Sequence, residues 1–180
     1  VDIEGFVPCH VKESYYFTSL RVVPYKRLDL FVEAFRLMPD KKLVVSGDGP
    51  ALAKIRASAP ANVQFLGFIS KEDLVSRMQK ARAFVLAAEE DFGITSLEAQ
   101  SCLTPVIALR RGGYLETVLE NKTGVFFHEQ KAESIRDAVM AFEAMDKPFE
   151  EIDFTKNVES FSTECFRSNI SNFIRQHAHA

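Results

Sequence analysis

The stretch Ala83-Phe84-Val85-Leu86-Ala87-Ala88-Glu89-Glu90-Asp91-Phe92-Gly93-Ile94-Thr95-Ser96-Leu97-Glu98 decides the fold. Its first six residues are apolar and suit a short strand that is buried on both faces, as in a parallel sheet. Beyond the acids and the glycine, Ile94, Leu97 and Leu103 follow helical spacing, which predicts a helix over residues 94–102. The stretch therefore predicts a strand, a short loop and a helix.

The rest of the chain repeats this alternation of short apolar runs and helical patterns. Further strands are expected at residues 15–22, 42–46, 63–66, 105–109 and 124–127, in addition to 83–88. Helical spacing predicts helices near residues 28–38, 74–78, 135–145 and 166–174, and Ser70 with Asp73 resembles an N-terminal cap. Such alternation favours an α/β fold with a doubly wound, Rossmann-like parallel sheet of about six strands.

The composition narrows the class of protein. With 180 residues, of which 47% are hydrophobic and 26% charged, the chain suits one well-buried globular domain. The formal net charge of −3 gives no electrostatic case for a nucleic-acid partner. The longest uninterrupted apolar run, residues 83–88, is too short to span a membrane.

Cysteine and histidine usage indicates neither a disulfide framework nor a metal site. The cysteines, Cys9, Cys102 and Cys165, are odd in number and far apart, which favours a reduced, cytoplasmic location. The histidines are scattered, and only His177 and His179 lie close together, near the end of the chain. We therefore expect no biological metal site.

Polar and glycine-containing loops follow five of the predicted strands. In a doubly wound sheet these loops share the carboxyl edge, where ligands bind at the point at which the connections reverse. The loops contain, in chain order, Arg21 and Lys26, Gly47-Asp48-Gly49-Pro50, Gly67-Phe68-Ile69, the Glu90 loop, and Arg110-Arg111-Gly112-Gly113. Together they predict one binding site at this edge.

The residue types in these loops suit a phosphorylated sugar or nucleoside. A glycine loop that leads into a helix exposes free backbone N–H groups beside the positive end of the helix dipole. Glu90 and Glu98, which flank this loop, can accept hydrogen bonds from vicinal hydroxyls. Arg21 and Lys26 lie on either side of Pro24, which stiffens the turn so that both cations can face one anion.

The same residues resemble the signature of a known enzyme family. Glu90 and Glu98 with seven residues between them, Phe92-Gly93 inside, and Thr104-Pro105-Val106-Ile107-Ala108 after them resemble the retaining glycosyltransferases of family 4. Members of this family have the GT-B fold. The resemblance runs from about residue 15 to residue 127 and continues more weakly to the C-terminus. It implies that the chain is the C-terminal, donor-binding half of such an enzyme.

The resemblance also implies roles for individual residues. Arg21 and Lys26 would hold the donor's diphosphate, Glu90 would contact hydroxyls of the donor sugar, and Glu98 would accept both ribose hydroxyls. Backbone N–H groups of Phe92, Gly93, Ile94 and Thr95 would face the sugar and phosphate, while Gly67-Phe68-Ile69 would frame the base, mostly through main chain. Gly47 is a further donor-binding candidate, although Gly-Asp-Gly-Pro equally suits a tight turn. The alternatives are that the charged residues occupy solvated surface positions and that the glycines form ordinary turns.

The resemblance further implies a domain organisation and partners. Residues 1–14 would link to a missing N-terminal, acceptor-binding domain, residues 15–148 would bind the nucleotide sugar, and residues 149–180, after Pro148, would form a C-terminal helical segment. No cofactor or metal is expected, because cationic side chains and helix dipoles replace it. The isolated chain should be inactive in transfer, and the full-length enzyme is expected in the cytoplasm, at the inner face of the membrane.

The donor is suggested by two stretches. Residues 89–94 and Arg110-Arg111-Gly112-Gly113-Tyr114-Leu115-Glu116-Thr117-Val118 resemble mannosyltransferases of surface-polysaccharide assembly. GDP-mannose is therefore the first expectation and UDP-sugars the next.

Three positions depart from the family pattern. Leu20 stands where glycine usually precedes the arginine, and Asp91 stands where glycine is common. Both changes affect the surroundings of a bound diphosphate. Leu103 replaces the usual glycine before Thr104, and leucine costs about 1 kcal/mol if this position has left-handed geometry.

Three other functions were weighed. An NAD-dependent dehydrogenase needs Gly-x-Gly-x-x-Gly after its first strand, but the turn here is Val23-Pro24-Tyr25-Lys26-Arg27, so we reject that function. A nucleotide-sugar 2-epimerase of the same fold would release free nucleotide and epimerised sugar without an acceptor. A non-catalytic nucleotide-sugar-binding module would bind the donor and never turn it over.

Overall fold

Within residues 1, 5–146 and 149–177, which the computed structural model describes, six strands form one parallel sheet. They are β1 (Tyr15–Ser19), β2 (Lys42–Ser46), β3 (Val63–Gly67), β4 (Ala83–Leu86), β5 (Val106–Leu109) and β6 (Gly124–Phe127), in the spatial order β3-β2-β1-β4-β5-β6. The predicted doubly wound sheet is confirmed. Pro148 and His179, which the sequence analysis named, lie outside the described residues.

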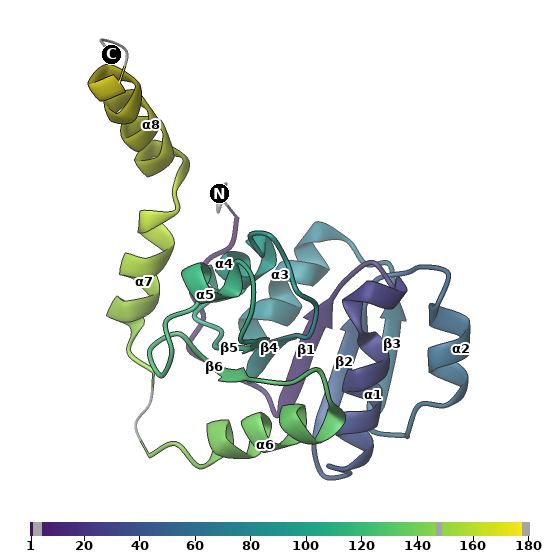
Figure 1. Ribbon diagram of the computed structural model, residues 1–180. Helices are drawn as coiled ribbons and strands as arrows, with labels where there is room; N and C mark the ends of the chain where they lie inside the picture. The colour runs from purple at the N-terminus through teal and green to yellow at the C-terminus, as the bar shows by residue number, and fades with distance from the viewer. Residues whose placement is uncertain (2–4, 147–148, 178–180) are drawn as a thin grey trace.

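Helices cover both faces of the sheet (Figure 1). One face carries α1 (Leu28–Arg36) and α6 (Ala132–Glu143), with the short α2 (Leu52–Ala57) beside them at the β3 edge. The other face carries α3 (Lys71–Lys80), α4 (Ile94–Ser101) and α5 (Tyr114–Thr117). Each face has its own apolar core, because every central strand is buried on both sides.

The structure corrects several expected boundaries. The first strand ends at Ser19 rather than at residue 22, and the fourth ends at Leu86 rather than at residue 88. The residues beyond these ends, including Val22 and Ala88, are nevertheless buried. Apolar character predicted their burial, but a strand also requires backbone hydrogen bonds to a neighbouring strand. The sequence pattern did not predict α2 and α5, because six and four residues are too few to show a helical period.

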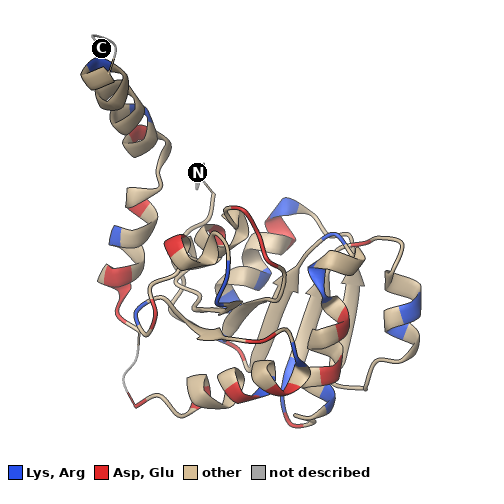
Figure 2. Cartoon of the chain, in the orientation of Figure 1, with Lys and Arg blue, Asp and Glu red and all other residues tan. Residues whose placement is uncertain are grey.

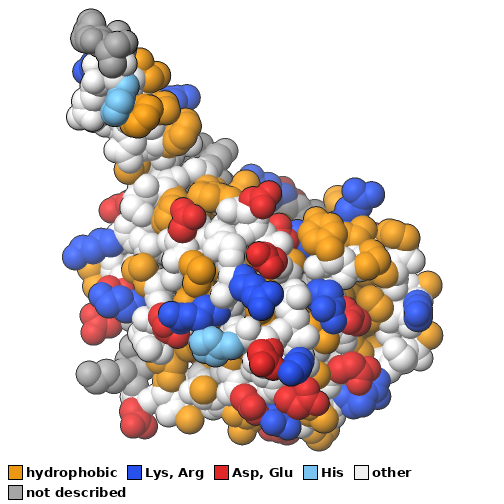
Figure 3. Space-filling view, viewed as in Figure 1, with side chains coloured by type: hydrophobic (Ala, Val, Ile, Leu, Met, Phe, Trp, Pro, Cys, Tyr) orange, Lys and Arg blue, Asp and Glu red, His pale blue; other side chains and the backbone are white. Residues whose placement is uncertain are grey.

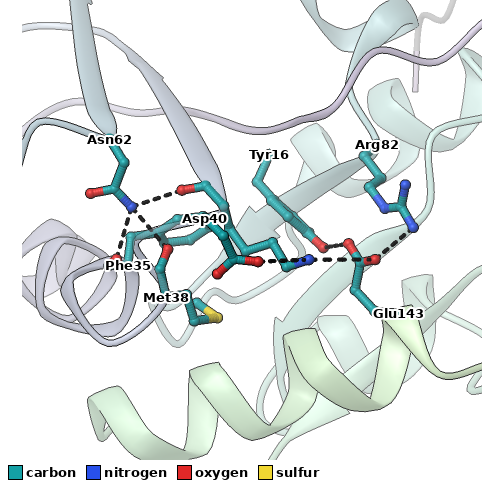
Figure 4. A network of polar contacts seen from close by, with 8 residues as sticks. Tyr16, Phe35, Met38, Asp40, Asn62, Arg82 and Glu143 are labelled. Carbon is teal, nitrogen blue, oxygen red and sulfur yellow. Dashed lines mark hydrogen bonds and ion pairs between the residues drawn. The ribbon is translucent and has the colours of Figure 1, made fainter.

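A polar network ties α6 to the amino ends of the strands (Figure 4). Glu143, at the end of α6, accepts a hydrogen bond from the hydroxyl of Tyr16 in β1. Its other carboxylate oxygen lies 2.7 Å from Nη2 of Arg82, which directly precedes β4. Burial, and then the bond to Glu143, raise the pKa of Tyr16 above its ordinary value. The network fixes the sheet at the edge opposite the loops that were predicted to bind ligand.

The segment before β1 is also attached to the sheet domain. The ammonium group of Lys12 donates to the carbonyls of Gln79 and Cys102 and to Oγ1 of Thr104, at 2.7, 3.1 and 2.8 Å. Burial lowers the pKa of Lys12 to about 8. These bonds hold the segment against the ends of α3 and α4. Its division from the sheet domain at residue 14 stays a prediction.

The C-terminal segment packs through its first helix and projects through its second. In α7 (Glu151–Ser160), the amide of Asn157 donates to Gln100 Oε1 at 2.7 Å and to the Thr117 carbonyl at 2.9 Å, which joins α7 to α4 and α5. In contrast, α8 (Thr163–His177) points away from the body (Figure 1), and none of its residues is buried. Hydrophobic side chains are exposed along this projection (Figure 3).

No helix among the described residues is long and apolar enough to cross a membrane.

The end of α4 explains the departure at Leu103. The Thr104 N–H donates to the Ala99 carbonyl at 3.0 Å, and the Leu103 N–H donates to the Gln100 carbonyl at 2.9 Å. This pair of bonds is the Schellman motif, in which the residue at Leu103 has left-handed geometry. Leu103 has φ +55°, so a leucine here carries the strain that glycine avoids.

Leu103→Gly should therefore be more stable than Leu103→Ala by about 1 kcal/mol, measured as the free energy of unfolding in urea. Both variants lose the same leucine packing, so their difference isolates the backbone strain. Equal stabilities would show that the left-handed geometry costs nothing at this position.

Glu143→Ala should lower the free energy of unfolding by roughly 1–3 kcal/mol, because it leaves the buried Tyr16 hydroxyl without its acceptor. Adding Tyr16→Phe to this variant should recover part of the loss, since the orphaned hydroxyl is then gone. Glu133→Ala, in the exposed first turn of the same helix, is the control. A loss from Glu143→Ala no larger than the control's would contradict this role.

Candidate functional site

The sheet reverses its direction of winding between β1 and β4. From β1 the chain moves outward to β2 and β3, and from β4 it moves the opposite way to β5 and β6. The loops that follow β1 and β4 therefore diverge and leave a crevice at the carboxyl edge. A cleft of about 790 Å³ lies there. Predicted site residues that line it are Arg21, Lys26, Gly47, Phe68, Glu90, Phe92, Gly93, Ile94 and Thr95.

Two cations line the β1 side of the cleft. Arg21 is exposed and makes no ion pair with any residue in the described ranges. Lys26, the last residue of the 3₁₀ turn η1 (Pro24–Lys26), has a half-buried side chain whose ammonium group contacts the carboxylate of Glu90. Pro24 begins this turn, as its sequence position suggested. The turn thus brings both cations to one side of the cleft.

The start of α4 forms the opposite wall. Gly93 precedes the helix with φ +82°, and no side chain caps the helix start. The N–H groups of Ile94 and Thr95 donate no hydrogen bond to the part of the chain that the structure describes. The side chain of Phe92 packs edge-to-face on Phe161, with ring centroids 5.8 Å apart. Two unpaired donors at the positive end of a helix make this wall suitable for an anion.

The loop after β5 supports the loop after β4. The N–H of Gly113 donates to the Glu90 carbonyl at 2.8 Å. A Cβ on Gly112 would collide with that carbonyl, and a Cβ on Gly113 would collide with the backbone of Phe92. Nη1 of Arg111 lies 4.0 Å from Oε2 of Glu89. Figure 2 shows the basic and acidic loops side by side at this edge. The predicted pair Gly112-Gly113 therefore forms a glycine platform, which supports the backbone of Glu90.

Glycine has a similar packing role after β2. Gly47 has φ +118°, and a Cβ there would collide with the Leu20 carbonyl. A Cβ on Gly49 would collide with the Val22 carbonyl. Both glycines are required because the loops after β1 and β2 touch through their backbones. Gly47 also lines the cleft. Leu20 lines it too, at the position where the family pattern has the smaller glycine.

Three predicted residues do not line the cleft, namely Glu98, Gly67 and Ile69. Gly67 instead accepts a hydrogen bond from the Gly47 N–H at 2.7 Å. Glu98 lies in the second turn of α4 and is half-buried. Burial raises the pKa of this carboxyl, and the charge of Lys71 at the start of α3 partly opposes the rise. Phe68, which stands between Gly67 and Ile69 in the sequence, is 87% exposed to solvent.

Several residues that line the cleft were not predicted as site residues, including Thr18, Ser19, Tyr25, Asp48 and Tyr114. Tyr25 stands between the two selected cations, and its ring centroid lies 5.1 Å from Nζ of Lys26. Tyr114 directly follows the glycine pair, and a Cβ on Gly93 would collide with its ring. Adjacency to selected residues was the available signal for both tyrosines.

Within the described ranges, no three His, Cys, Asp or Glu side chains lie close enough together to hold a metal ion.

Two mycobacterial proteins illustrate the sequence relatives. The GDP-mannose-dependent alpha-(1-6)-phosphatidylinositol monomannoside mannosyltransferase of Mycolicibacterium smegmatis is 33% identical over 136 residues. The D-inositol 3-phosphate glycosyltransferase of Mycobacterium avium is 31% identical over 130 residues. Each match covers 66% of this chain, and it covers 36% and 31% of the respective relative. The chain therefore spans about a third of the length of these relatives.

Solved structures share the fold at low sequence identity. The apo form of the lipopolysaccharide outer core galactosyltransferase WaaB superimposes with a TM-score of 0.80 at 18% identity, covering 98% of this chain and 54% of WaaB. Anabaena HepE in complex with UDP and glucose superimposes with a TM-score of 0.78 at 18% identity, covering 92% of this chain and 49% of HepE. These superpositions show that the chain has the Rossmann-like fold of the domains in GT-B glycosyltransferases.

The family model described as "Glycosyl transferases group 1" matches residues 7–157, which include the whole sheet and the cleft. By this match, the chain belongs to the group 1 glycosyl transferases.

Proposed function

We propose that this chain is the donor-binding half of a retaining glycosyltransferase and that the cleft binds a nucleotide sugar. One observation carries the proposal. Arg21 and Lys26 line one side of a cleft whose other side is the uncapped start of α4, with the free N–H groups of Ile94 and Thr95. Cations and oriented N–H groups that face the same space suit a diphosphate.

In this proposal the diphosphate lies between the two cations and α4. Each charge-assisted hydrogen bond contributes roughly 1.5–3 kcal/mol. The same groups stabilise the charge that accumulates on the nucleoside diphosphate as the glycosidic bond breaks. By resemblance to the family, the departing phosphate assists attack by the acceptor on the same face of the sugar, so no side chain of this chain acts as nucleophile.

The contact between Lys26 and Glu90 has a natural place in donor binding. Without donor, the cation and the acid satisfy each other. With donor, Lys26 turns to the diphosphate, and the carboxylate of Glu90 accepts hydrogen bonds from sugar hydroxyls. The donor thus replaces one internal ion pair with an ion pair between Lys26 and the diphosphate and with hydrogen bonds from the sugar to Glu90, so both charged groups keep polar partners in the half-buried site.

The nucleoside occupies the β3 side of the cleft in this proposal. Glu98 accepts the ribose hydroxyls, while Phe68, which is exposed at the rim, covers the base. Gly67 and Ile69 contribute main-chain surface. Glu98 does not line the cleft, so the ribose must extend past Thr95 along the side of α4 to reach it.

GDP-mannose is the first candidate for the donor. The resemblance of residues 89–94 and 110–118 to mannosyltransferases supports it, as does the GDP-mannose-dependent mannosyltransferase of M. smegmatis to which the chain is similar. UDP-sugars are the next candidates, and HepE was solved with UDP and glucose. The donor is a substrate, and the proposal requires no metal or other cofactor.

The acceptor would bind mainly to a second domain that precedes this one in the full-length enzyme. The short span of the match relative to its relatives supports such a domain. A glycan or a lipid-linked sugar is the expected acceptor class, and a location at the inner face of the membrane stays a prediction.

A thermal-shift panel of GDP, UDP and ADP with their sugar conjugates tests the proposal. A ligand at about 100 times its Kd adds roughly 2.7 kcal/mol of stability to the folded chain, and GDP-mannose should give the largest rise in Tm. Arg21→Ala should reduce the rise, whereas Arg167→Ala on α8, remote from the cleft, should not. Absence of a shift with every nucleotide would refute the proposal, and transfer by the isolated chain would refute the division between donor and acceptor domains.

Glu98→Gln should weaken nucleotide binding by roughly 1.5–3 kcal/mol in calorimetry while stabilising the folded chain at pH 7. The carboxyl pKa is raised above 4.5 in the folded state, so the folded state holds this proton more tightly than the unfolded state. Stability is therefore lost as the pH rises from 4.5 through the raised pKa, and glutamine avoids that loss. Glu159→Gln on α7 is an exposed control. Unchanged nucleotide affinity in Glu98→Gln would exclude the ribose role.

A further inference from the structure

Tyr114 differs from the other buried tyrosines in its hydrogen bonding. The hydroxyl of Tyr15 donates to the Arg77 carbonyl at 2.9 Å, and that of Tyr16 donates to Glu143. Tyr114 is 1% exposed, yet its hydroxyl makes no hydrogen bond to any residue in the described part of the chain. Among the described residues, the fully buried side-chain oxygens without a partner are Thr18 Oγ1 and Ser46 Oγ, and the Tyr114 hydroxyl is not one of them. Its oxygen is therefore accessible, and it is free to bond to a ligand.

The cleft is where that partner can reach it. Tyr114 lines the cleft as the first residue of α5, directly after the glycine platform. Burial, and then the nearby Glu90 and Tyr25, raise the pKa of Tyr114 above its ordinary value. The hydroxyl therefore keeps its proton at neutral pH, and it can donate a hydrogen bond to a ligand oxygen.

The position of Tyr114 along the sheet indicates which part of the ligand it meets. Phe68 follows β3 and Tyr114 follows β5, so three strands, β2, β1 and β4, separate the two ends of the cleft. The proposed function places the base near Phe68 and the sugar near Glu90. Tyr114 lies on the Glu90 side, because the platform that precedes it holds the Glu90 carbonyl.

We propose that Tyr114 is a specificity-determining residue whose hydroxyl donates a hydrogen bond to a hydroxyl oxygen of the transferred sugar. This inference rests on the proposed function, which supplies the nucleotide sugar. A site that hydrogen-bonds a particular hydroxyl discriminates against sugars that lack it or present it elsewhere, since the buried phenol would then stay unpaired.

The ring of Tyr114 has a separate, structural role that the test must exclude. The ring lies so close to Gly93 that no Cβ fits between them, and it therefore supports the start of α4. Tyr114→Phe keeps this ring and removes only the hydroxyl. Any loss of affinity that is confined to the sugar can then be assigned to the hydrogen bond.

The test is calorimetric titration of the 180-residue chain with GDP and GDP-mannose, and with UDP and UDP-glucose as a second pair. Tyr114→Phe should weaken binding of the nucleotide sugar about tenfold and change binding of the nucleoside diphosphate less than about twofold. Tyr15→Phe is the matched control, because it removes a buried hydroxyl that does not line the cleft. It should leave both affinities unchanged.

Several outcomes would overturn the inference. If Tyr114→Phe weakens binding of the diphosphate and of the nucleotide sugar equally, the hydroxyl maintains the shape of the loop and does not contact the sugar. A fall in Tm together with lost diphosphate binding would lead to the same conclusion. Unchanged affinity for the nucleotide sugar would show that the hydroxyl does not meet it. Failure of the wild-type chain to bind any of the four ligands would refute the proposed function itself, and this inference with it.

Discussion

The cleft depends on a contact between two loops that leaves no room for side chains. The loops after β4 and β5 meet through backbone atoms at Gly112 and Gly113, and the Gly113 N–H fixes the Glu90 carbonyl at 2.8 Å. Gly93 meets the ring of Tyr114 with equal closeness. This contact sets where Glu90 lies and where α4 begins, and hence the distance between the cations and the helix start. Larger residues would push the start of α4 away from the cations.

The two edges of the sheet differ in how well their polar groups are satisfied. At the amino edge, Glu143 is fully engaged by Tyr16 and Arg82. At the carboxyl edge, the described residues leave the N–H groups of Ile94 and Thr95 unpaired, and burial raises the pKa of Glu98. Unsatisfied groups lower stability, and their concentration in one cleft is typical of a site whose remaining partners belong to a ligand.

The C-terminal segment contributes to the site indirectly. The amide of Asn157 in α7 donates hydrogen bonds to residues of both α4 and α5. At the end of α7, Phe161 packs against the ring of Phe92 in the loop after β4. This ring contact connects the C-terminal segment to the loop after β4, and Phe92 itself lines the cleft. Beyond α7, α8 adds no buried residue to the domain.

The sequence by itself determined the parallel sheet, the loops at its carboxyl edge and the pairing of cations with a glycine-led helix, because burial and chain direction are written in local patterns of residues. It also indicated the strain at Leu103, whose φ is +55°. Only the tertiary structure decided where β1 and β4 end, since a strand ends where its backbone hydrogen bonds to the neighbouring strands end. It alone placed Lys26 on Glu90, left Glu98 outside the lining of the cleft, and made Tyr114 part of that lining. Those relations join segments far apart in the chain, and packing rather than local sequence sets the distances between them.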